Sequence, residues 1–165
     1  MSCINQLLSR RSVRKFKKEP VADEIIQNIL EAGRLAPSAT NVQPWHFIML
    51  RKQEAKEACS FQGFNGWTSD SDFIIVGVYK PSQPMMDHYA LMDVTIALQN
   101  MVIAGALQGV GSCWIGAWDD TKLRSVIGLP SDYKIVGLVP FGIPDGVPSQ
   151  PNKKPLENIV HYEKW

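Results

Sequence analysis

The feature that most constrains the fold is a long apolar helical pattern that begins at Met85 or Asp87 and ends at Leu107. Its apolar residues wrap most of the helix circumference; they are Leu91, Val94, Ile96, Ala97, Leu98, Met101, Val102, Ile103 and Ala104. A helix that is apolar nearly all round is buried on more than one side. A chain of 165 residues offers few other elements to cover it. We therefore predict that a second subunit covers part of this helix.

The composition is typical of one soluble globular domain, which we place over residues 1–165. Of the residues, 45% are apolar, and 17 basic against 16 acidic side chains leave a net charge of +1. A disordered chain would be less apolar and more charged, and a protein held on DNA by charge would be clearly basic. We therefore expect no nucleic-acid partner. Between Tyr89 and Val110 lie Asp93, Gln99, Asn100 and Gln108, and we expect this stretch to be too polar for a membrane span.

The cysteines and the N-terminal residues indicate the compartment. Cys3, Cys59 and Cys113 are odd in number and widely spaced, without a C-x-x-C pair. This pattern argues against a disulfide framework and against a four-cysteine zinc site. The first residues lack the charged start and apolar run of a signal peptide. We therefore expect a cytoplasmic protein without membrane contact.

The hydrophobic periodicity predicts alternating helices and strands with no internal repeat. The expected helices cover residues 3–9, 22–35, 53–60, 87–107 and 119–127, and the expected strands cover 45–50, 73–79, 112–118 and 134–143. The strand at 73–79 is continuously apolar, which indicates burial on both faces. Residues 61–70 read as a packed loop. The last ten residues form a partly apolar arm that we expect to dock on another surface.

Four segments are candidates for ligand binding. Arg10, Arg11, Ser12 and Arg14 follow a helix and suit a phosphate or a carboxylate, because arginine makes bidentate charged contacts. A solvated basic helix end explains the same run equally simply. Near the C-terminus, Lys153 and Lys154 could supply a second phosphate contact, or they are two exposed lysines.

The other two segments are loops. Residues 37–45 offer Asn41 and Gln43, whose amides suit the alternating donors and acceptors of a flavin or purine edge; a tight, well-capped loop is the alternative. Residues 109–116 contain three glycines that let a ligand approach the backbone, or that simply stop a helix before a strand. This run is not a dinucleotide fingerprint, because the third glycine of that motif is missing.

Conventional catalytic residues are sparse. The histidines have no metal-ligand spacing, no serine lies in a G-x-S-x-G elbow, and Cys113 lies in an apolar strand without a neighbouring cation. We therefore expect no metal site. If the chain is an enzyme, a cofactor carries its chemistry.

Taken together and in order, these segments resemble the nitroreductase family of flavin enzymes. The matching stretches are Arg10 to Phe16, Ala36 to Phe47, Asp93-x5-Gln99-Asn100-Met101, Gly109 to Gly116, and Lys154 to Tyr162. The resemblance implies an α+β fold of three layers, with a mixed, mainly antiparallel sheet surrounded by helices. It also implies an obligate homodimer with FMN at the subunit interface. NADH or NADPH would reduce the flavin, and a nitroaromatic, quinone or similar small-molecule acceptor would reoxidise it in a ping-pong cycle.

The resemblance also assigns site residues. Arg10, Ser12 and Arg14 match positions that hold the FMN phosphate and part of the isoalloxazine or ribityl chain, and Arg11 between them could contribute its backbone. In the family, the other subunit contributes a loop to the flavin site, and the positions of that loop match Pro37, Ser38, Ala39 and Asn41. A turn along the flavin, with the backbone of Gly116 near N5, matches Trp114, Ile115, Gly116 and Ala117. Lys153 or Lys154 matches a basic residue at the phosphate that is often arginine in the family.

The chain departs from larger members of the family between the first two predicted strands, where insertions that cover the substrate are short or missing. Phe61, Phe64 and Trp67 could form a reduced lid, or they pack locally. Two alternatives to a reductase remain: a flavin-binding or sensing module without turnover, and an enzyme of the same fold that cleaves flavin or dehalogenates an aromatic compound.

Overall fold

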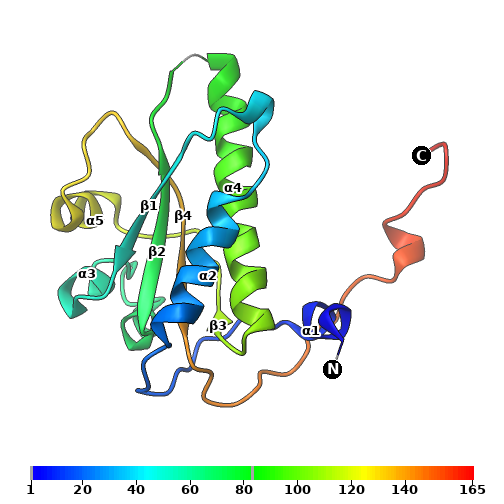
Figure 1. The fold of residues 1–165 in the computed structure, drawn as a ribbon, viewed down its shortest axis with the longest axis horizontal. Coiled ribbons are helices and arrows are strands. Elements are labelled where there is room, and N and C mark those ends of the chain that lie inside the picture. Colours follow the sequence, from blue (N-terminus) through cyan, green and yellow to red (C-terminus); the bar gives the residue numbers. More distant parts are fainter. Residues whose placement is uncertain (1, 83) are drawn as a thin grey trace.

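The computed structural model describes residues 2–82 and 84–165. Figure 1 shows a central sheet with helices on both faces and a C-terminal segment that extends away from the body. The helices are α1 (Cys3–Ser9), α2 (Asp23–Arg34), α3 (Gln53–Glu57), α4 (Pro84–Leu107) and α5 (Asp120–Ile127), with short 3-10 turns η1 (Ala39–Asn41), η2 (Gly66–Asp70) and η3 (Leu156–Asn158). The strands are β1 (Trp45–Leu50), β2 (Phe73–Tyr79), β3 (Gly111–Ser112) and β4 (Lys134–Gly142).

The sheet has the strand order β1-β2-β4-β3, and every pair of neighbouring strands is antiparallel. The prediction of a mixed sheet is therefore wrong for the named strands. Within the described residues, parallel pairing is confined to one isolated bridge between Ser12 and Ser112. The α+β class and the dominance of antiparallel pairing are confirmed.

The fold has three layers because successive side chains of β2 point to opposite faces of the sheet. Its odd residues, such as Phe73 and Ile75, belong to a core cluster under α2 and α4, whereas its even residues, such as Ile74 and Val76, belong to a second cluster under α3 and α5. All seven residues of β2 are buried. This confirms that the continuous apolar run is covered on both faces, because each face of the strand has its own helical layer.

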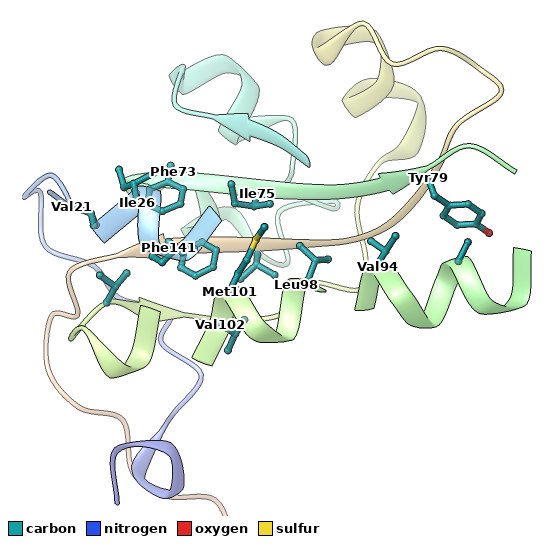
Figure 2. Packing of buried hydrophobic residues seen from close by; sticks show 14 residues of the cluster. Val21, Ile26, Phe73, Ile75, Tyr79, Val94, Leu98, Met101, Val102 and Phe141 are labelled. Atoms are coloured by element: carbon teal, nitrogen blue, oxygen red, sulfur yellow. The ribbon is translucent and has the colours of Figure 1, made fainter. Parts of the chain in front are cut away.

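The larger cluster is organised by α4. Figure 2 shows Val94, Leu98 and Met101 of α4 pointing toward the strands, where Phe73 and Phe141 lie together. The rings of these two phenylalanines stack with centroids 5.1 Å apart. Segment Met86–Leu107 is long and apolar enough, by length and composition, to cross a membrane. Its polar residues therefore do not exclude a span by themselves, but in this fold the helix is the central element of the core.

Part of α4 remains uncovered. Several of its apolar side chains are 40–47% exposed, namely Tyr89, Leu91, Met92 and Ile96. The helix is thus buried against its own sheet and has a second, open apolar face, as its all-round apolar pattern predicts.

Two local predictions need correction. The expected strand at 112–118 is reduced to Gly111–Ser112, because its ladder with β4 is interrupted at Cys113 and Trp114 and resumes only as a single bridge between Ile115 and Leu138. The helix expected over 53–60 ends at Glu57. The C-terminal arm leaves Leu156, Tyr162 and Trp165 72%, 86% and 101% exposed, and its docking on another surface stays a prediction.

The close approach of α4 to β2 depends on Gly77. A Cβ built there would lie 2.6 Å from Cδ1 of Leu98, so a larger residue must displace α4 or the strand. We expect Gly77→Ala to lower the free energy of unfolding by roughly 1–3 kcal/mol, as overpacked cores do. Urea denaturation would measure this loss.

Gly66→Ala is the matched control, since no atom lies within 4 Å of a Cβ at that position. If both substitutions lowered the free energy of unfolding equally, the close contact at Gly77 would not be the cause of the loss.

Candidate functional site

The basic segment after α1 is held to the sheet edge by its backbone. Val13 N–H donates to the carbonyl of Ser112 at 2.9 Å, beside the parallel bridge between Ser12 and Ser112. Gly111 allows this approach, because a Cβ there would lie 2.8 Å from the Val13 side chain. The pairing brings Arg10 to Arg14 next to the turn that follows β3, although about a hundred residues separate them in the sequence.

A second tether holds the segment from the other side. Phe16 pairs with Pro144, and the Lys15 ammonium lies 2.7 Å from the Asp145 carboxylate. The hydrogen bond from Lys15 lowers the pKa of Asp145 and in turn raises the pKa of Lys15. The pair fixes the start of the loop that runs on to Lys153.

Beside these tethers lies a basic cavity of about 650 Å³. Its lining includes five of the predicted residues, namely Arg10, Arg11, Ser12, Arg14 and Lys153. The rest of the lining comes from the end of α1 and from residues 148–151, and none of the lining residues is acidic. Lys154 does not line this cavity, so only Lys153 of the two predicted lysines belongs to it. A cavity lined by cations without carboxylates is suited to an anion.

The arginines of this cavity are not equivalent. The Arg11 guanidinium donates to the carbonyl of Arg10 at 2.9 Å and to Oε1 of Gln150 at 2.7 Å. It therefore holds the loop in place. Arg10 and Arg14 form no ion pair with any described residue. These two guanidinium groups have charge available for a ligand.

A second cavity of about 470 Å³ lies beside the first, and Arg14 lines both. Its floor is the predicted turn from Trp114 to Ala117, and Phe64, Asn65 and Trp67 form another wall. No atom lies within 4 Å of a Cβ at Gly116, and the Gly116 N–H donates to no described residue. Gly116 thus lines the cavity and has a backbone donor without a partner among the described residues.

Trp114 is oriented by a contact that the sequence did not reveal. Its indole Nε1–H donates to Oε1 of Gln99 on α4 at 2.9 Å. The ring lies over Gly137, where a Cβ would come within 2.9 Å of it. Gln99 stands in one of the stretches that resemble the nitroreductase family, and that position is the signal that could have identified it. Asn65, whose Nδ2 donates to the carbonyl of Ala117 in the turn at 3.2 Å, has no comparable sequence signal.

The predicted cross-subunit loop lies apart from both cavities. Pro37, Ser38, Ala39 and Asn41 line neither of them. In Figure 1 this loop lies near the start of α4, whereas α1 lies near the end of that helix. Ala39 N–H donates to both carboxylate oxygens of the buried Asp93, at 3.2 and 3.3 Å. Within one chain, the four residues therefore do not join the other predicted residues.

The described residues contain no cluster of three or more metal-ligating side chains. All three cysteines are free, and burial raises the pKa of the Cys59 thiol to about 12. His46 is exposed on β1 and packs edge-on against Tyr133. The two cavities bring together cationic, hydroxyl, amide and aromatic side chains, and the lining of the second also includes Cys113.

Comparison with known proteins places the fold and the sequence in one family. The nitroreductase family profile matches residues 7–70 and 62–143. A protein of Archaeoglobus fulgidus with the provisional name NADH dehydrogenase/NAD(P)H nitroreductase is 31% identical over 99% of this chain and 98% of its own length. The iodotyrosine deiodinase of Daphnia pulex is 26% identical over 93% of this chain and 64% of its own length.

A solved structure shows the same fold. The structure of an NADPH:FMN oxidoreductase from Vibrio harveyi with NAD+ superposes with a TM-score of 0.90, at 23% identity, over 99% of this chain and 77% of that protein. The fold, the profile match and the relatives agree with the resemblance noted in the sequence. The chain belongs to the nitroreductase family and is, as its sequence predicts, an oxidoreductase.

Proposed function

We propose that the protein is a cytoplasmic, FMN-dependent oxidoreductase that takes reducing equivalents from NADH or NADPH and delivers them to a small conjugated acceptor. The observation that carries the proposal is the pair of adjoining cavities. One is lined by cations without a carboxylate, and the other has an open backbone donor at Gly116.

The donor set fits FMN from end to end. Arg10, Ser12, Arg14 and Lys153 offer charged and hydroxyl donors for the phosphate. Because Arg14 lines both cavities, the ribityl chain would run past it toward the turn at Trp114 to Ala117. The Gly116 N–H would then face the ring nitrogen where negative charge grows on reduction, which stabilises the reduced state.

When bound, FMN supplies hydride acceptance from NAD(P)H and electron delivery to the acceptor. The chain's own residues bind and orient. Trp114, held by Gln99, forms part of the turn's surface, and Arg10 and Arg14 neutralise the phosphate. No titratable side chain is required at the reacting atoms, because solvent can supply protons to the open cavity.

We propose that the active unit is a homodimer. The open apolar face of α4 and the projecting C-terminal arm both leave large apolar side chains in water, a feature typical of interaction surfaces. The loop that bears Pro37, Ser38, Ala39 and Asn41 lies apart from its own chain's cavities, which fits its contribution to the partner's flavin site. The backbone of this loop is held in an unusual conformation, because Thr40, Asn41 and Gln43 all have positive φ.

A second candidate function is reductive dehalogenation of an aromatic compound. It is favoured by the similarity to iodotyrosine deiodinase, which extends over nearly the whole chain. Both functions use the same flavin site and differ in product. Halide release from a halogenated phenol, measured beside amine formation from a nitroaromatic, separates them.

The proposed function predicts the behaviour of the visible spectrum. The purified protein should bind FMN at micromolar concentration, and anaerobic addition of NADH or NADPH should bleach the flavin absorbance. Addition of a quinone should then restore it. A protein that takes up no FMN would refute the proposal, and a flavin that neither nucleotide bleaches would point to a different reductant or to a binding module without turnover.

The role of Arg10 predicts a selective loss of FMN affinity. A hydrogen bond to a charged group contributes roughly 1.5–3 kcal/mol, so Arg10→Ala should raise the Kd for FMN roughly 10- to 150-fold. Fluorescence titration of FMN measures this change.

The control for that variant is Arg34→Ala, which removes the same charge from an exposed position on α2 outside both cavities. It should leave the Kd unchanged. If urea denaturation shows that lost stability accounts for the weaker FMN binding of Arg10→Ala, the arginine is structural.

The proposed dimer predicts an effect of charge on the open face of α4. Ile96→Glu, at a side chain that is 40% exposed, should shift the protein toward monomers and weaken FMN binding, because a buried carboxylate at an interface is costly. Light scattering after size exclusion measures the mass. Val126→Glu, on α5 at 37% exposure, is the matched control and should remain dimeric. Unchanged mass for Ile96→Glu would place the interface elsewhere.

A further inference from the structure

The loop that contains η1 is tied to α4 by one buried carboxylate. Asp93 is only 5% exposed, and both of its oxygens accept from the Ala39 N–H, at 3.2 and 3.3 Å. Among the described residues, every other hydrogen bond of residues 37–44 stays inside the loop. The Asp93 carboxylate is therefore the one hydrogen-bonded anchor that joins this loop to the rest of the described chain.

The loop is also the only described partner of this carboxylate. No lysine or arginine of the described chain forms an ion pair with Asp93. Burial of a carboxylate costs free energy unless hydrogen bonds or a cation offset the loss of water. The Ala39 N–H supplies such a bond, and a bond that a charged group accepts is stronger than one between neutral groups. The contact therefore stabilises the loop and the carboxylate together.

The loop depends on an anchor because of its backbone. Thr40, Asn41 and Gln43 have φ of 49°, 58° and 51°, which lie in the left-handed region. A β-branched residue such as Thr40 seldom adopts this region. Conformations of this kind persist only where the surrounding structure holds them, and they cluster at functional sites. The Gln43 N–H closes the loop on itself by donating to Oγ of Ser38 at 2.9 Å, whereas Asp93 fixes the loop against α4.

We propose that Asp93 is a positioning residue, which holds the loop of one chain in the conformation that completes the flavin site of the other chain. This inference rests on the proposed function, including the homodimer. The four predicted loop residues line neither cavity of their own chain, and the loop lies at the opposite end of α4 from α1 (Figure 1). Loss of the anchor should therefore weaken FMN binding at the partner's site, whereas loss of Arg10 weakens it at the site of the same chain.

The first test measures FMN affinity by fluorescence titration. Asp93→Ala should raise the Kd for FMN roughly 5- to 30-fold, because a charged hydrogen bond that shapes the site is lost. Asp87→Ala is the matched control. It removes the same group from the same helix, at a position that pairs with Lys134 and lies outside both cavities, and it should leave the Kd unchanged. An unchanged Kd for Asp93→Ala would overturn the proposal.

A second variant removes the donor instead of the acceptor. Ser38 is extended, with φ −140° and ψ 157°, and Ala39 is the first residue of η1, so the backbone accepts a proline at position 39. Ala39→Pro deletes the donated N–H and leaves α4 unchanged, which keeps the contact testable should Asp93→Ala fail to fold. The double variant should bind FMN no more weakly than the weaker single variant, because both act through one contact. Additive losses would overturn the proposal.

Mixed dimers decide which chain the loop serves. An Arg10→Ala chain and an Asp93→Ala chain are co-expressed with different affinity tags, and the mixed dimer is purified on both tags. At one of its sites an intact Arg10 meets an intact loop from the partner. That site should bind FMN with the Kd of the unmodified protein, although neither parent homodimer has such a site. A merely structural role of Asp93 would not produce this recovery.

The converse dimer pairs an unmodified chain with a chain that carries both substitutions. It should have no site with the unmodified Kd, because the intact cavity receives the altered loop. An unmodified site in this second dimer, or none in the first, would show that Asp93 does not act across the interface and would overturn the proposal. If the unmodified protein binds no FMN or is a monomer, the proposed function fails instead.

Discussion

The structure depends on the packing of α4 against β2. Gly77 faces the helix and lets Leu98 and Val94 approach the strand more closely than any side chain would permit. The helix then buries Met101 between the strands and α2, where Gly33 makes a similar close approach to the Met101 side chain. One helix therefore closes the larger core, and its ends determine where α1 and the η1 loop lie.

Because α4 and the sheet form a rigid centre, the proposed site can be assembled at the sheet edge from segments that are far apart in the sequence. The pairing of Ser12 with Ser112 sets the basic segment beside the turn, and Gln99 reaches from α4 to orient Trp114. Most of this arrangement is held together by backbone hydrogen bonds. The side chains of Arg10 and Arg14 therefore remain without protein partners among the described residues. In the proposed function, these two cations would pair with the FMN phosphate.

The same helix explains the proposed need for a second subunit. A chain of 165 residues has too few other elements to cover every face of a helix that is apolar all round. Met92 and Ile96 of α4 remain exposed after the helix has packed on its own sheet. The loop held by Asp93 lies at the opposite end of α4 from Arg10 (Figure 1). The proposed dimer would therefore have to cover the open face of α4 and place this loop at the other chain's cavity.

Residue types and periodicity alone predicted the long helix, the doubly buried strand at 73–79, the α5 helix between Asp119 and Gly128, and the basic segment, because these depend on local pattern and charge. They overestimated the strand after Gly111, since a strand persists only where a neighbour pairs with it, and here the pairing with β4 is interrupted at Cys113 and Trp114 before a single bridge at Ile115. They also could not assign roles to Gln99 or Asn65, or choose between Lys153 and Lys154. Those roles depend on distances across the fold: a polar or aromatic side chain has no fixed role until tertiary packing decides which atoms surround it.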